Sequence, residues 1–528
     1  MKLHELHIQN FKFFPKHDPK SPLLEINGKN LLIYGENGSG KSTIYWAIYT
    51  LLESSFKVNE FDVEKYFKKG GEFGLVNIHA TKTKPPFIKM VLKDDTGNNP
   101  KEYEVNPNLH QIVANMNDSS IRESGMASDF INYRVLFRLH HVKHSKDNDL
   151  FGWFEDEIFP YILIEKISKV KSIADTFREL KAGPPKVNAF DEPGKKVFPN
   201  PTMKDHEQEA VKKDYKLYQK YTNQIKRFNT RFNTWLKDRV KRANEILKDD
   251  FEQNFEIKLD YIPGKANVTE DDPGWESPKI VLKVPKYEGK RNVVRRAHSF
   301  LNEAKWTSIG LALRFAIIED TDSRPDNPDL KLLTIDDMLL SLDMSNRDVV
   351  LNLLLNRYST DYQILMMTHD RYFFELAKGK INASGSLGNW VKLEMYLDEE
   401  RNKKYPLVLK SKTNLEKAKS FFKQKEFAAS ANHMRKATEC FVYEFMPKNK
   451  QYDRSFNSLN LSQLINKSRA LARKRGWSRT IISDLDQMRT NIFNPGSHHD
   501  VYTPVFQNEL KKAIETLEQV STLSGIKL

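Results

Sequence analysis

Cysteine is nearly absent from this chain of 528 residues, which has a single one, Cys440. One cysteine excludes an intramolecular disulfide framework and any zinc site built from several cysteines. Long apolar runs are also missing, because no uninterrupted stretch reaches about 18 residues, so no membrane span is expected. The opening MKLHELHIQNFKFF alternates and shows no small-residue cleavage site, so it does not predict a signal peptide. We expect a cytoplasmic protein that does not bind membranes.

Charge and length set the next limits. Lys and Arg number 84 against 70 Asp and Glu, which gives a formal net charge of +14. Such an excess favours an anionic partner, either a nucleotide or a nucleic acid. Hydrophobic residues make up 39% of the chain, enough to build cores, and the length is too great for one core. The composition therefore predicts a basic protein of several domains.

A glycine-rich segment lies between an apolar strand pattern, LLIYG at 31–35, and an apolar helix pattern, and it predicts a nucleotide site. GENGSGKST fits the P-loop pattern G-x-x-x-x-G-K-[ST], whose backbone N–H groups close around phosphates. Lys41 is placed to reach the β- and γ-phosphates, and the Ser42 hydroxyl to reach Mg²⁺. ATP and Mg²⁺ are the expected cofactors. The predicted nucleotide-binding residues of this segment are Gly35, Asn37, Gly38, Ser39, Gly40, Lys41, Ser42 and Thr43.

Two further apolar strands end in polar residues that suit phosphate chemistry. KLLTIDD ends in Asp336, expected to hold Mg²⁺ through water, and Asp337, expected to orient or deprotonate the attacking water. YQILMMTHD brings His369 to the γ-phosphate. An acidic pair that caps a helix and a structural histidine are the alternatives, but the order of these motifs favours function. Lys41, Asp337 and His369 are the predicted catalytic residues, and Ser42 and Asp336 the predicted metal residues.

The motifs GENGSGKST, IDD, SLDMSNR and MMTHD occur in the order found in ABC-type ATPase heads of the SMC and RecF kind, which the chain resembles over roughly 1–90 and 285–380. IQNFKFF resembles the first strand of that family and places Lys12 near the nucleotide. The resemblance implies an α/β P-loop head that dimerises with ATP. Asn302 and Asp343 would then act across the dimer interface on the site of the second copy.

Three departures from the family pattern are visible. The Leu-Ser-Gly-Gly signature is replaced by FLNEA, with Asn302 at the serine and Glu303 and Ala304 at the two glycines, a variant that resembles bacterial defence ATPases. Asp337 stands where glutamate is usual, which implies slow or partner-dependent hydrolysis. HHVKHSK at 140–146 lies where a magnesium-sensing glutamine is expected.

A helical pattern runs from 129 to 181, and residues 203–251 show a seam typical of a coiled coil. The seam residues are Tyr218, Tyr221, Ile225, Phe228, Phe232 and Trp235. We expect the run 155–181 to pack against them, in an arm too short to entrap DNA. The predicted domains are 1–150 and 253–408 for the two parts of the ATPase head, 151–252 for a short α-helical coiled-coil insertion, and 409–528 for an all-α domain.

The predicted C-terminal domain opens with a helical hairpin at 413–446, in which Arg435 and Glu439 form an i,i+4 pair. It resembles a HEPN domain, a bundle often used as a metal-independent ribonuclease, and bacterial anticodon nucleases join such a domain to an ABC-type ATPase. His498 would be the acid or base. Arg435 or Arg489 would stabilise charge, with Asn491 and Glu439 orienting them. A surface ion pair and a loop cap are the alternatives.

These patterns lead to one hypothesis and two alternatives. The hypothesis is an anti-phage defence ATPase whose ATP-dependent assembly controls a nuclease, either its own C-terminal domain or a separate partner protein. Expected partners are a second copy of the chain and a nucleic acid, tRNA or DNA. The alternatives are a repair ATPase that binds DNA ends without cutting them, and a scaffold whose C-terminal helices dock a partner.

Overall fold

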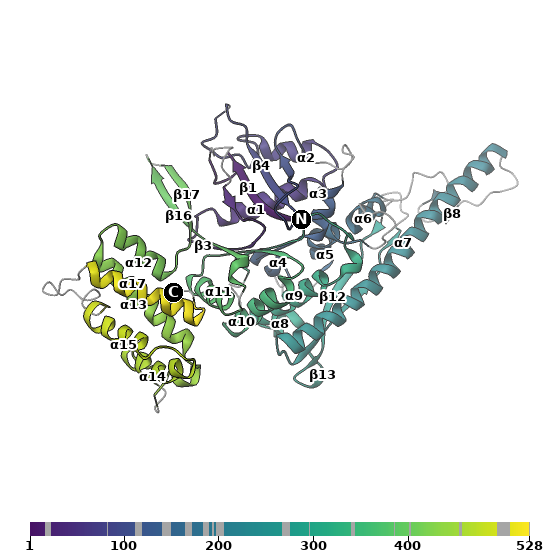
Figure 1. The fold of residues 1–528 in the computed structure, drawn as a ribbon. Helices are drawn as coiled ribbons and strands as arrows, with labels where there is room; N and C mark the ends of the chain where they lie inside the picture. Colours follow the sequence, from purple (N-terminus) through teal and green to yellow (C-terminus); the bar gives the residue numbers. More distant parts are fainter. Residues whose placement is uncertain are drawn as a thin grey trace. The chain divides into compact units, whose positions relative to one another are not determined.

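The computed structural model forms two compact units (Figure 1). Unit 1 comprises Met1–Phe374 and Met395–Val408, and unit 2 comprises Glu375–Glu394 and Leu409–Leu528. The structure describes residues 1–15, 23–81, 83–110, 119–139, 149–163, 172–182, 190–192, 195–196, 205–266, 275–294, 296–338, 344–384, 386–400, 403–453, 457–493, 507–526 and 528. Within these residues no helix is both long and apolar enough to cross a bilayer.

Two sheets of unit 1 enclose helix α1 (Lys41–Ser54). The helix packs on β4 and β5 of an antiparallel sheet ordered β2-β1-β4-β5, and also on β14 and β15 of a larger sheet ordered β17-β16-β3-β15-β14-β6. The strands are β1 (Lys2–Gln9), β2 (Leu24–Glu25), β3 (Asn30–Gly35), β4 (Phe87–Lys93), β5 (Lys101–Val105), β6 (Asp129–Asn132), β14 (Leu332–Asp336), β15 (Gln363–Thr368), β16 (Trp390–Glu400) and β17 (Lys403–Lys410). Ten of the fourteen residues of α1 are buried, as expected of a helix covered on two sides.

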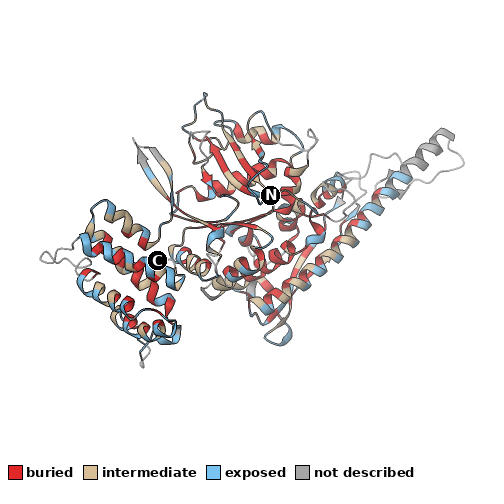
Figure 2. Cartoon of the chain, viewed as in Figure 1, coloured by how far each residue is buried: buried red, intermediate tan, exposed pale blue. Residues whose placement is uncertain are grey.

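The four strands β3, β15, β14 and β6 run parallel, so their carboxyl ends meet at one edge of the sheet. The register pairs Asp336 with Met367 and with Asn132, and Thr368 with Tyr34. β14, β15 and β6 are buried along their whole length, as parallel strands covered on both faces must be. Figure 2 shows which parts of the chain are buried and which are exposed. This edge therefore gathers the residues that follow four separate stretches of sequence.

The other helices of unit 1 surround these sheets. They are α2 (Phe61–Glu64), α3 (Ser120–Ala127), α4 (Tyr133–Phe137), α5 (Phe151–Glu157), α6 (Ile173–Lys181), α7 (Asp205–Glu245), α8 (Ala297–Phe300), α9 (Glu303–Ile318) and α10 (Met344–Leu353), with α11 (Arg371–Ala383) beginning in unit 1, and short 3₁₀ or π turns at η1 (Lys65–Phe67), η3 (Phe159–Tyr161), η4 (Ile246–Asp250), η5 (Thr321–Ser323) and η6 (Leu354–Tyr358). Helix α9 is buried from Trp306 to Ile318, and at Gly310 an added Cβ would lie 2.6 Å from Leu139. Close packing on both sides thus fixes α9 in the core.

The long helix α7 has 41 residues, which at about 1.5 Å per residue makes roughly 60 Å. Its aromatic face packs on α5, η3 and α6: the Phe232 ring lies 5.2 Å from Phe159, and Phe228 lies 5.8 Å from Phe177. The predicted packing of the run 155–181 against this helix is therefore present. The same helix also packs on α9 and on β9 (Phe255–Ile262), so the head covers much of the predicted seam.

The prediction of one helical pattern from 129 to 181 was wrong in two places. Residues Asp129–Asn132 form the buried strand β6, and the described part of the rest is divided among α4, α5, η3 and α6. A segment of four residues, Asp-Phe-Ile-Asn, is too short to show a helical or strand period, so periodicity could not separate a buried strand from a helix here. Further strands are β7 (Phe190–Glu192), β8 (Lys195–Lys196), β10 (Lys265–Ala266), β11 (Trp275–Glu276), β12 (Lys279–Tyr287) and β13 (Lys290–Val294), with β13, β12 and β9 forming one sheet.

Unit 2 is mainly a helical bundle. Its helices are α12 (Asn414–Lys423), α13 (Phe427–Phe445), α14 (Leu461–Lys474), α15 (Arg479–Met488) and α17 (Gln507–Ser524), with short turns η7 (Leu387–Asn389), η8 (Lys448–Lys450) and η9 (Arg489–Phe493). The predicted hairpin at 413–446 is α12 and α13, and the stripe on α13 buries Met434, Phe441 and Phe445 in one core with α14, α15 and α17. Thr413 and Glu416 form a capping box that begins the hairpin.

Candidate nucleotide site

The P-loop connects β3 to α1 with backbone that favours glycine at two positions. Gly38 has φ 84° and Gly40 has φ 100°, in the left-handed region that side chains with a Cβ rarely adopt. At Gly35 the constraint is space, because an added Cβ would lie 2.5 Å from the Ser39 hydroxyl oxygen. Ser39 is fully buried, and its hydroxyl has no hydrogen-bond partner among the described residues.

Lys41 begins α1 and turns its ammonium group back into the loop. Its Nζ donates to the carbonyl oxygens of Gly35 at 2.5 Å and Glu36 at 3.1 Å. Burial lowers the pKa of Lys41, and the nearby carboxylates Asp337 and Asp336 oppose that shift. The P-loop lysine and the two predicted carboxylates are therefore electrostatic neighbours.

Asp336 ends β14 as a buried carboxylate with an unsatisfied oxygen. Burial raises its pKa to about 6, with Asp337 adding repulsion, while a hydrogen bond from Ser42 and the charge of Lys41 act in the opposite direction. Its Oδ1 is buried and has no hydrogen-bond partner within the described structure. A serine hydroxyl beside a carboxylate with a vacant acceptor is a set of hard oxygen ligands that fits Mg²⁺.

Asp337 and His369 form a pair at the same edge of the sheet. Oδ1 of Asp337 accepts the His369 backbone N–H at 2.8 Å and lies 2.9 Å from the His369 ring nitrogen Nδ1. Asp337 has φ 48°, a left-handed conformation that is uncommon outside glycine and is often held at functional sites. Its backbone N–H donates to the Met367 carbonyl at 3.1 Å, so the turn is fixed against β15.

Lys12 is half-buried just after β1. Its ammonium lies 5.2 Å from the centroid of the Trp46 ring of α1, and its backbone carbonyl accepts a hydrogen bond from Asn77. Burial lowers the pKa of Lys12, and the nearby charge of Arg134 lowers it further. Because Trp46 lies five positions beyond Lys41 on the same helix, Lys12 is held beside the helix that the P-loop begins.

Asn302 is the exposed N-cap of α9. Its Oδ1 accepts the Lys305 backbone N–H at 3.0 Å, so the side chain satisfies one free donor of the helix. Asp343, the second residue predicted to act in trans, lies outside the described residues, as does HHVKHSK at 140–146.

Asn132 belongs to this edge and was not predicted. It ends β6 in register with Asp336, is buried, and donates from Nδ2 to the Tyr45 hydroxyl at 3.0 Å. Its Oδ1 accepts the Val135 N–H and so caps α4. The sequence offered one signal, an asparagine that follows Phe130 and Ile131 and precedes a helical pattern, but the strand itself was not predicted.

In unit 2 the predicted ribonuclease residues lie on packed elements but in separate pairs. Arg435 and Glu439 lie on α13, with Nε and Oε1 3.1 Å apart. Arg489 lies in η9, which packs on α13, and donates to Asp486 at 3.1 Å. Asn491 is exposed in the same turn. His498 lies outside the described residues.

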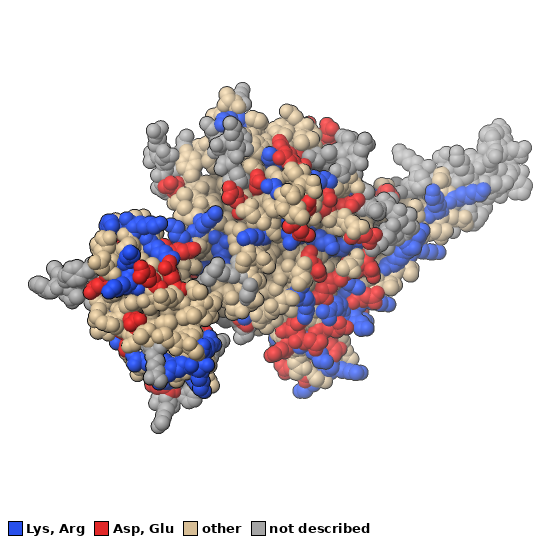
Figure 3. All heavy atoms as spheres, viewed as in Figure 1, with Lys and Arg blue, Asp and Glu red and all other residues tan. Residues whose placement is uncertain are grey.

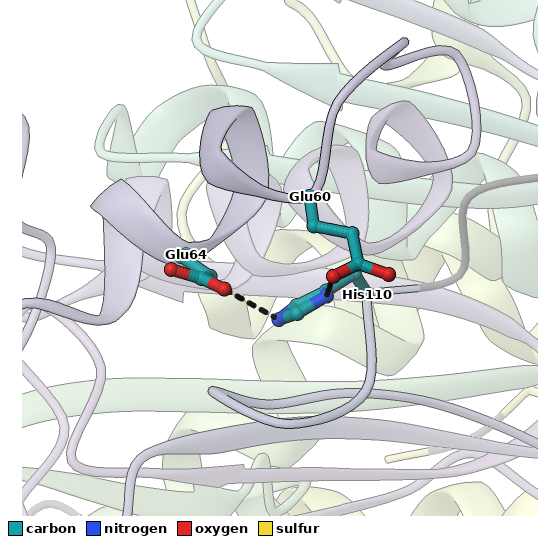
Figure 4. A group of neighbouring side chains, drawn as sticks. All are labelled: Glu60, Glu64 and His110. Carbon is teal, nitrogen blue, oxygen red and sulfur yellow. Dashed lines mark ion pairs between the residues drawn. The ribbon is translucent and has the colours of Figure 1, made fainter.

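One other group in unit 1 brings together residue types that bind metals. Glu60, Glu64 and His110 lie together (Figure 4), with the two ring nitrogens of His110 each 3.9 Å from a different glutamate. Nε2 donates to the Pro107 carbonyl at 2.8 Å. Both carboxylates are more than one third exposed, and they lie on opposite nitrogens of the ring, so the group is a histidine between two solvated glutamates.

Comparisons with known proteins bear on the class of unit 1. Residues 5–266 match the family model described as an AAA domain. No curated protein matches the chain. The family match contains the P-loop and ends before β14. Together with the geometry of the sheet edge, it identifies unit 1 as a P-loop ATPase fold with a mixed sheet.

Several solved structures are similar to the chain at low identity. One is the SMC head bound to the C-winged helix domain of ScpA, at 12% identity and TM-score 0.40, with 78% of this chain and 98% of that chain covered. Another is the SMC head domain from Thermotoga maritima, at 14% identity and TM-score 0.34, with 78% and 100% covered. A third is the recombination mediator protein RecF with ATP in the RecFOR pathway, at 14% identity and TM-score 0.42, with 78% and 98% covered.

The raised pKa of Asp336 gives a pH-dependent prediction for Asp336→Asn. Above pH 6 the wild-type carboxylate is charged and buried, whereas below the ordinary aspartate pKa it is neutral in both the folded and unfolded states. The variant should therefore be more stable than wild type at pH 7.5, with a free energy of unfolding larger by an amount on the order of 2 kcal/mol and a higher unfolding temperature. This difference in stability should vanish as the pH falls from about 6 toward 4. Thermal unfolding without nucleotide measures it.

Asp95→Asn is the control, because that side chain is 84% exposed. It should leave the unfolding temperature unchanged at every pH. A difference in unfolding temperature between Asp336→Asn and wild type that does not change with pH would contradict the assignment of a buried carboxylate with a raised pKa.

Proposed function

We propose that this chain binds and hydrolyses ATP with Mg²⁺, as an ATPase of the SMC and RecF kind. The observation that carries the proposal is the single sheet edge where the P-loop, Asp336, Asp337 and His369 meet. The P-loop follows β3, Asp336 and Asp337 lie at the end of β14, and His369 follows β15, so the register of β14 and β15 fixes their spacing. An edge of this kind, at the carboxyl ends of the strands, is where ligands bind in open α/β sheets.

The residues present divide the chemistry of phosphoryl transfer between them. The P-loop N–H groups and Lys41 hold the phosphates, and Ser42 and Asp336 would hold Mg²⁺, which supplies charge neutralisation at the β- and γ-phosphates. Asp337 is placed to orient the attacking water, and the backbone N–H of His369, which donates to Oδ1 of Asp337, holds the carboxylate in position. Aspartate is one methylene shorter than glutamate, so we expect turnover to be slow.

The proposal includes pairing of two copies around the nucleotide. The N-terminus of α9 carries Asn302 on the surface, and a sixteen-residue helix presents a positive dipole end there. One P-loop surrounds one side of a triphosphate, so the surface around Asn302 of a second copy can complete the site. Binding energy of that interface would then favour association in the presence of ATP.

The proposed role of the ATPase is to control a nuclease in anti-phage defence. The support is the helical unit 2 with its Arg435–Glu439 pair, and η9 packed on the same helix. The effector is either this unit acting on tRNA or a separate nuclease bound to it. The competing functions are a repair ATPase that binds DNA ends and a scaffold that docks a partner.

Two inactive variants should regain activity when they are mixed. Lys41→Ala removes the phosphate contact, and Asn302→Asp keeps the N-cap but places a negative charge at the surface proposed to meet phosphate. Each should reduce ATP hydrolysis at least about 100-fold, a loss expected of a group that stabilises transferred charge. An equimolar mixture that pairs at random should recover about one quarter of wild-type turnover, because half of its dimers are mixed and each mixed dimer holds one intact site of two.

Asn302→Ser is the matched control, since it keeps both a hydrogen-bonding side chain and a good N-cap, and it should remain active. ATP turnover by released phosphate is the readout. No recovery on mixing would exclude the composite site while leaving the P-loop assignment intact. Turnover by Lys41→Ala at the wild-type rate would contradict ATP hydrolysis at this site.

The effector is tested with total tRNA, ATP and the full chain. Cleavage that disappears in His498→Ala and in Arg435→Ala supports the ribonuclease in unit 2. Intact tRNA together with DNA-stimulated ATP hydrolysis supports the repair function. No effect of either nucleic acid, with a protein that copurifies with unit 2, supports a separate effector or a scaffold.

A further inference from the structure

Helix α14 of unit 2 ends in a run of exposed cations. Arg473 and Lys474 occupy its last turn, and Arg475 follows directly; all three are exposed. In the surrounding sequence, residues 454–483 include seven Lys or Arg and no Asp or Glu. Figure 3 shows Lys and Arg side chains gathered over the part of unit 2 where Figure 1 labels α14.

These three cations have no carboxylate partner in the described part of the chain, although neighbouring arginines do. Arg469, one turn earlier, pairs with Asp486 at 3.0 Å, and Arg489 pairs with the same aspartate. None of Arg473, Lys474 and Arg475 forms an ion pair with any described residue. Their charge is therefore available to an external anion.

The end of the helix holds the cations in place. Gly476 has φ 76°, its N–H donates to the Arg473 carbonyl, and the Trp477 N–H donates to Ala472, both at 3.0 Å, which is a Schellman motif. Trp477 is buried and its ring lies 4.9 Å from Phe445. The Arg475 guanidinium lies 4.6 Å from the centroid of the same Phe445 ring. The backbone and one of the three side chains are thus fixed by the core.

Stabilisation of the helix dipole explains only part of this arrangement. Cations in the last turn of a helix are favourable, and Arg473 and Lys474 fulfil that role. The dipole effect acts within about one turn, so it does not account for a stretch of thirty residues without an acidic side chain. It also does not require Arg475, which lies beyond the helix and is ordered by Phe445.

A protein partner fits this surface less well than a nucleic acid. Protein interfaces are organised around a buried apolar centre, with aromatic and aliphatic anchors. Among the described residues of unit 2, the large exposed hydrophobic side chains are Leu409, Tyr443, Tyr452 and Leu523, and none lies between 453 and 522. A basic surface without an apolar centre is typical of contacts to phosphates.

We propose that the C-terminal end of α14 binds the phosphate backbone of a nucleic acid through Arg473, Lys474 and Arg475. The inference deepens the proposed function by assigning a contact surface on unit 2. It does not depend on ATP hydrolysis or on cleavage. Phosphate contacts of this kind carry no base specificity, so RNA and DNA share the chemistry and are separated by experiment.

The test is a binding titration with the full chain, using labelled total tRNA in one arm and a labelled 30-base-pair duplex DNA in the other. The triple variant Arg473→Gln, Lys474→Gln and Arg475→Gln should bind the preferred nucleic acid at least about 10-fold more weakly near physiological salt. The slope of log affinity against log salt should fall by about two to three, because each lost phosphate contact removes about one released counterion.

A matched control removes the same number of charges elsewhere in unit 2. Lys423→Gln, Lys511→Gln and Lys512→Gln change exposed residues on α12 and α17 and should alter affinity less than 3-fold. Equal weakening by the two triple variants would show an effect of net charge alone and would overturn the proposal. Absence of binding to both nucleic acids by wild type would also overturn it.

ATP turnover by both triple variants separates the proposed phosphate-binding surface from the proposed ATP hydrolysis. Unchanged turnover with lost binding supports the surface assignment. Lys41→Ala should lose ATP turnover but keep nucleic-acid binding, because its α14 is unchanged.

Discussion

The parallel register of β3, β15, β14 and β6 is the constraint on which the rest of unit 1 depends. Parallel strands place all their carboxyl ends at one edge, so residues more than two hundred positions apart in the chain become neighbours there. Gly35, Asp336, His369 and Asn132 come together for this reason alone. Lys41 and Asp336 are buried at this edge, and burial strengthens the charge interaction between them.

Burial favours the neutral form of two ionisable groups at this edge. It raises the pKa of Asp336 to about 6 and lowers the pKa of Lys41. The charge of each group favours the charged form of the other and so opposes the shift that burial causes. A bound triphosphate with Mg²⁺ would relieve both, since it adds negative charge beside Lys41 and a divalent cation beside Asp336. The electrostatic strain of the protein is thus complementary to the ligand that we propose.

Helix α9 has a buried body and an exposed N-terminus. It is buried from Trp306 to Ile318, with Gly310 allowing close approach to Leu139, whereas its first residues and Asn302 lie on the surface. The arm helix α7 packs along it, and Arg242 of α7 donates to Glu319 at the end of α9 at 2.6 Å. A ligand that engaged the exposed end of α9 would therefore act on an element rigidly packed against the arm.

The sequence predicted those parts of the candidate site that are short motifs with a fixed spacing between their residues. The P-loop, KLLTIDD and YQILMMTHD have chemical patterns that do not depend on the rest of the fold, and the structure places all three at one edge. Asn132 was missed because β6 has four residues, too few for a period, and a helix follows directly. The basic end of α14 was missed because charge in sequence does not show which cations are paired. Only the structure separates Arg469, which binds Asp486, from Arg473.

The most direct test of the central claim is the Mg²⁺ dependence of ATP affinity in Asp336→Asn and Asp337→Asn, measured by calorimetric titration with and without Mg²⁺. In the proposed site Asp336 binds the metal and its neighbour Asp337 orients the attacking water. Asp337→Asn should therefore bind ATP with Mg²⁺ as tightly as wild type without hydrolysing it, whereas Asp336→Asn should lose the contribution of Mg²⁺ to the affinity. Equal Mg²⁺ dependence in the two variants would contradict the assignment.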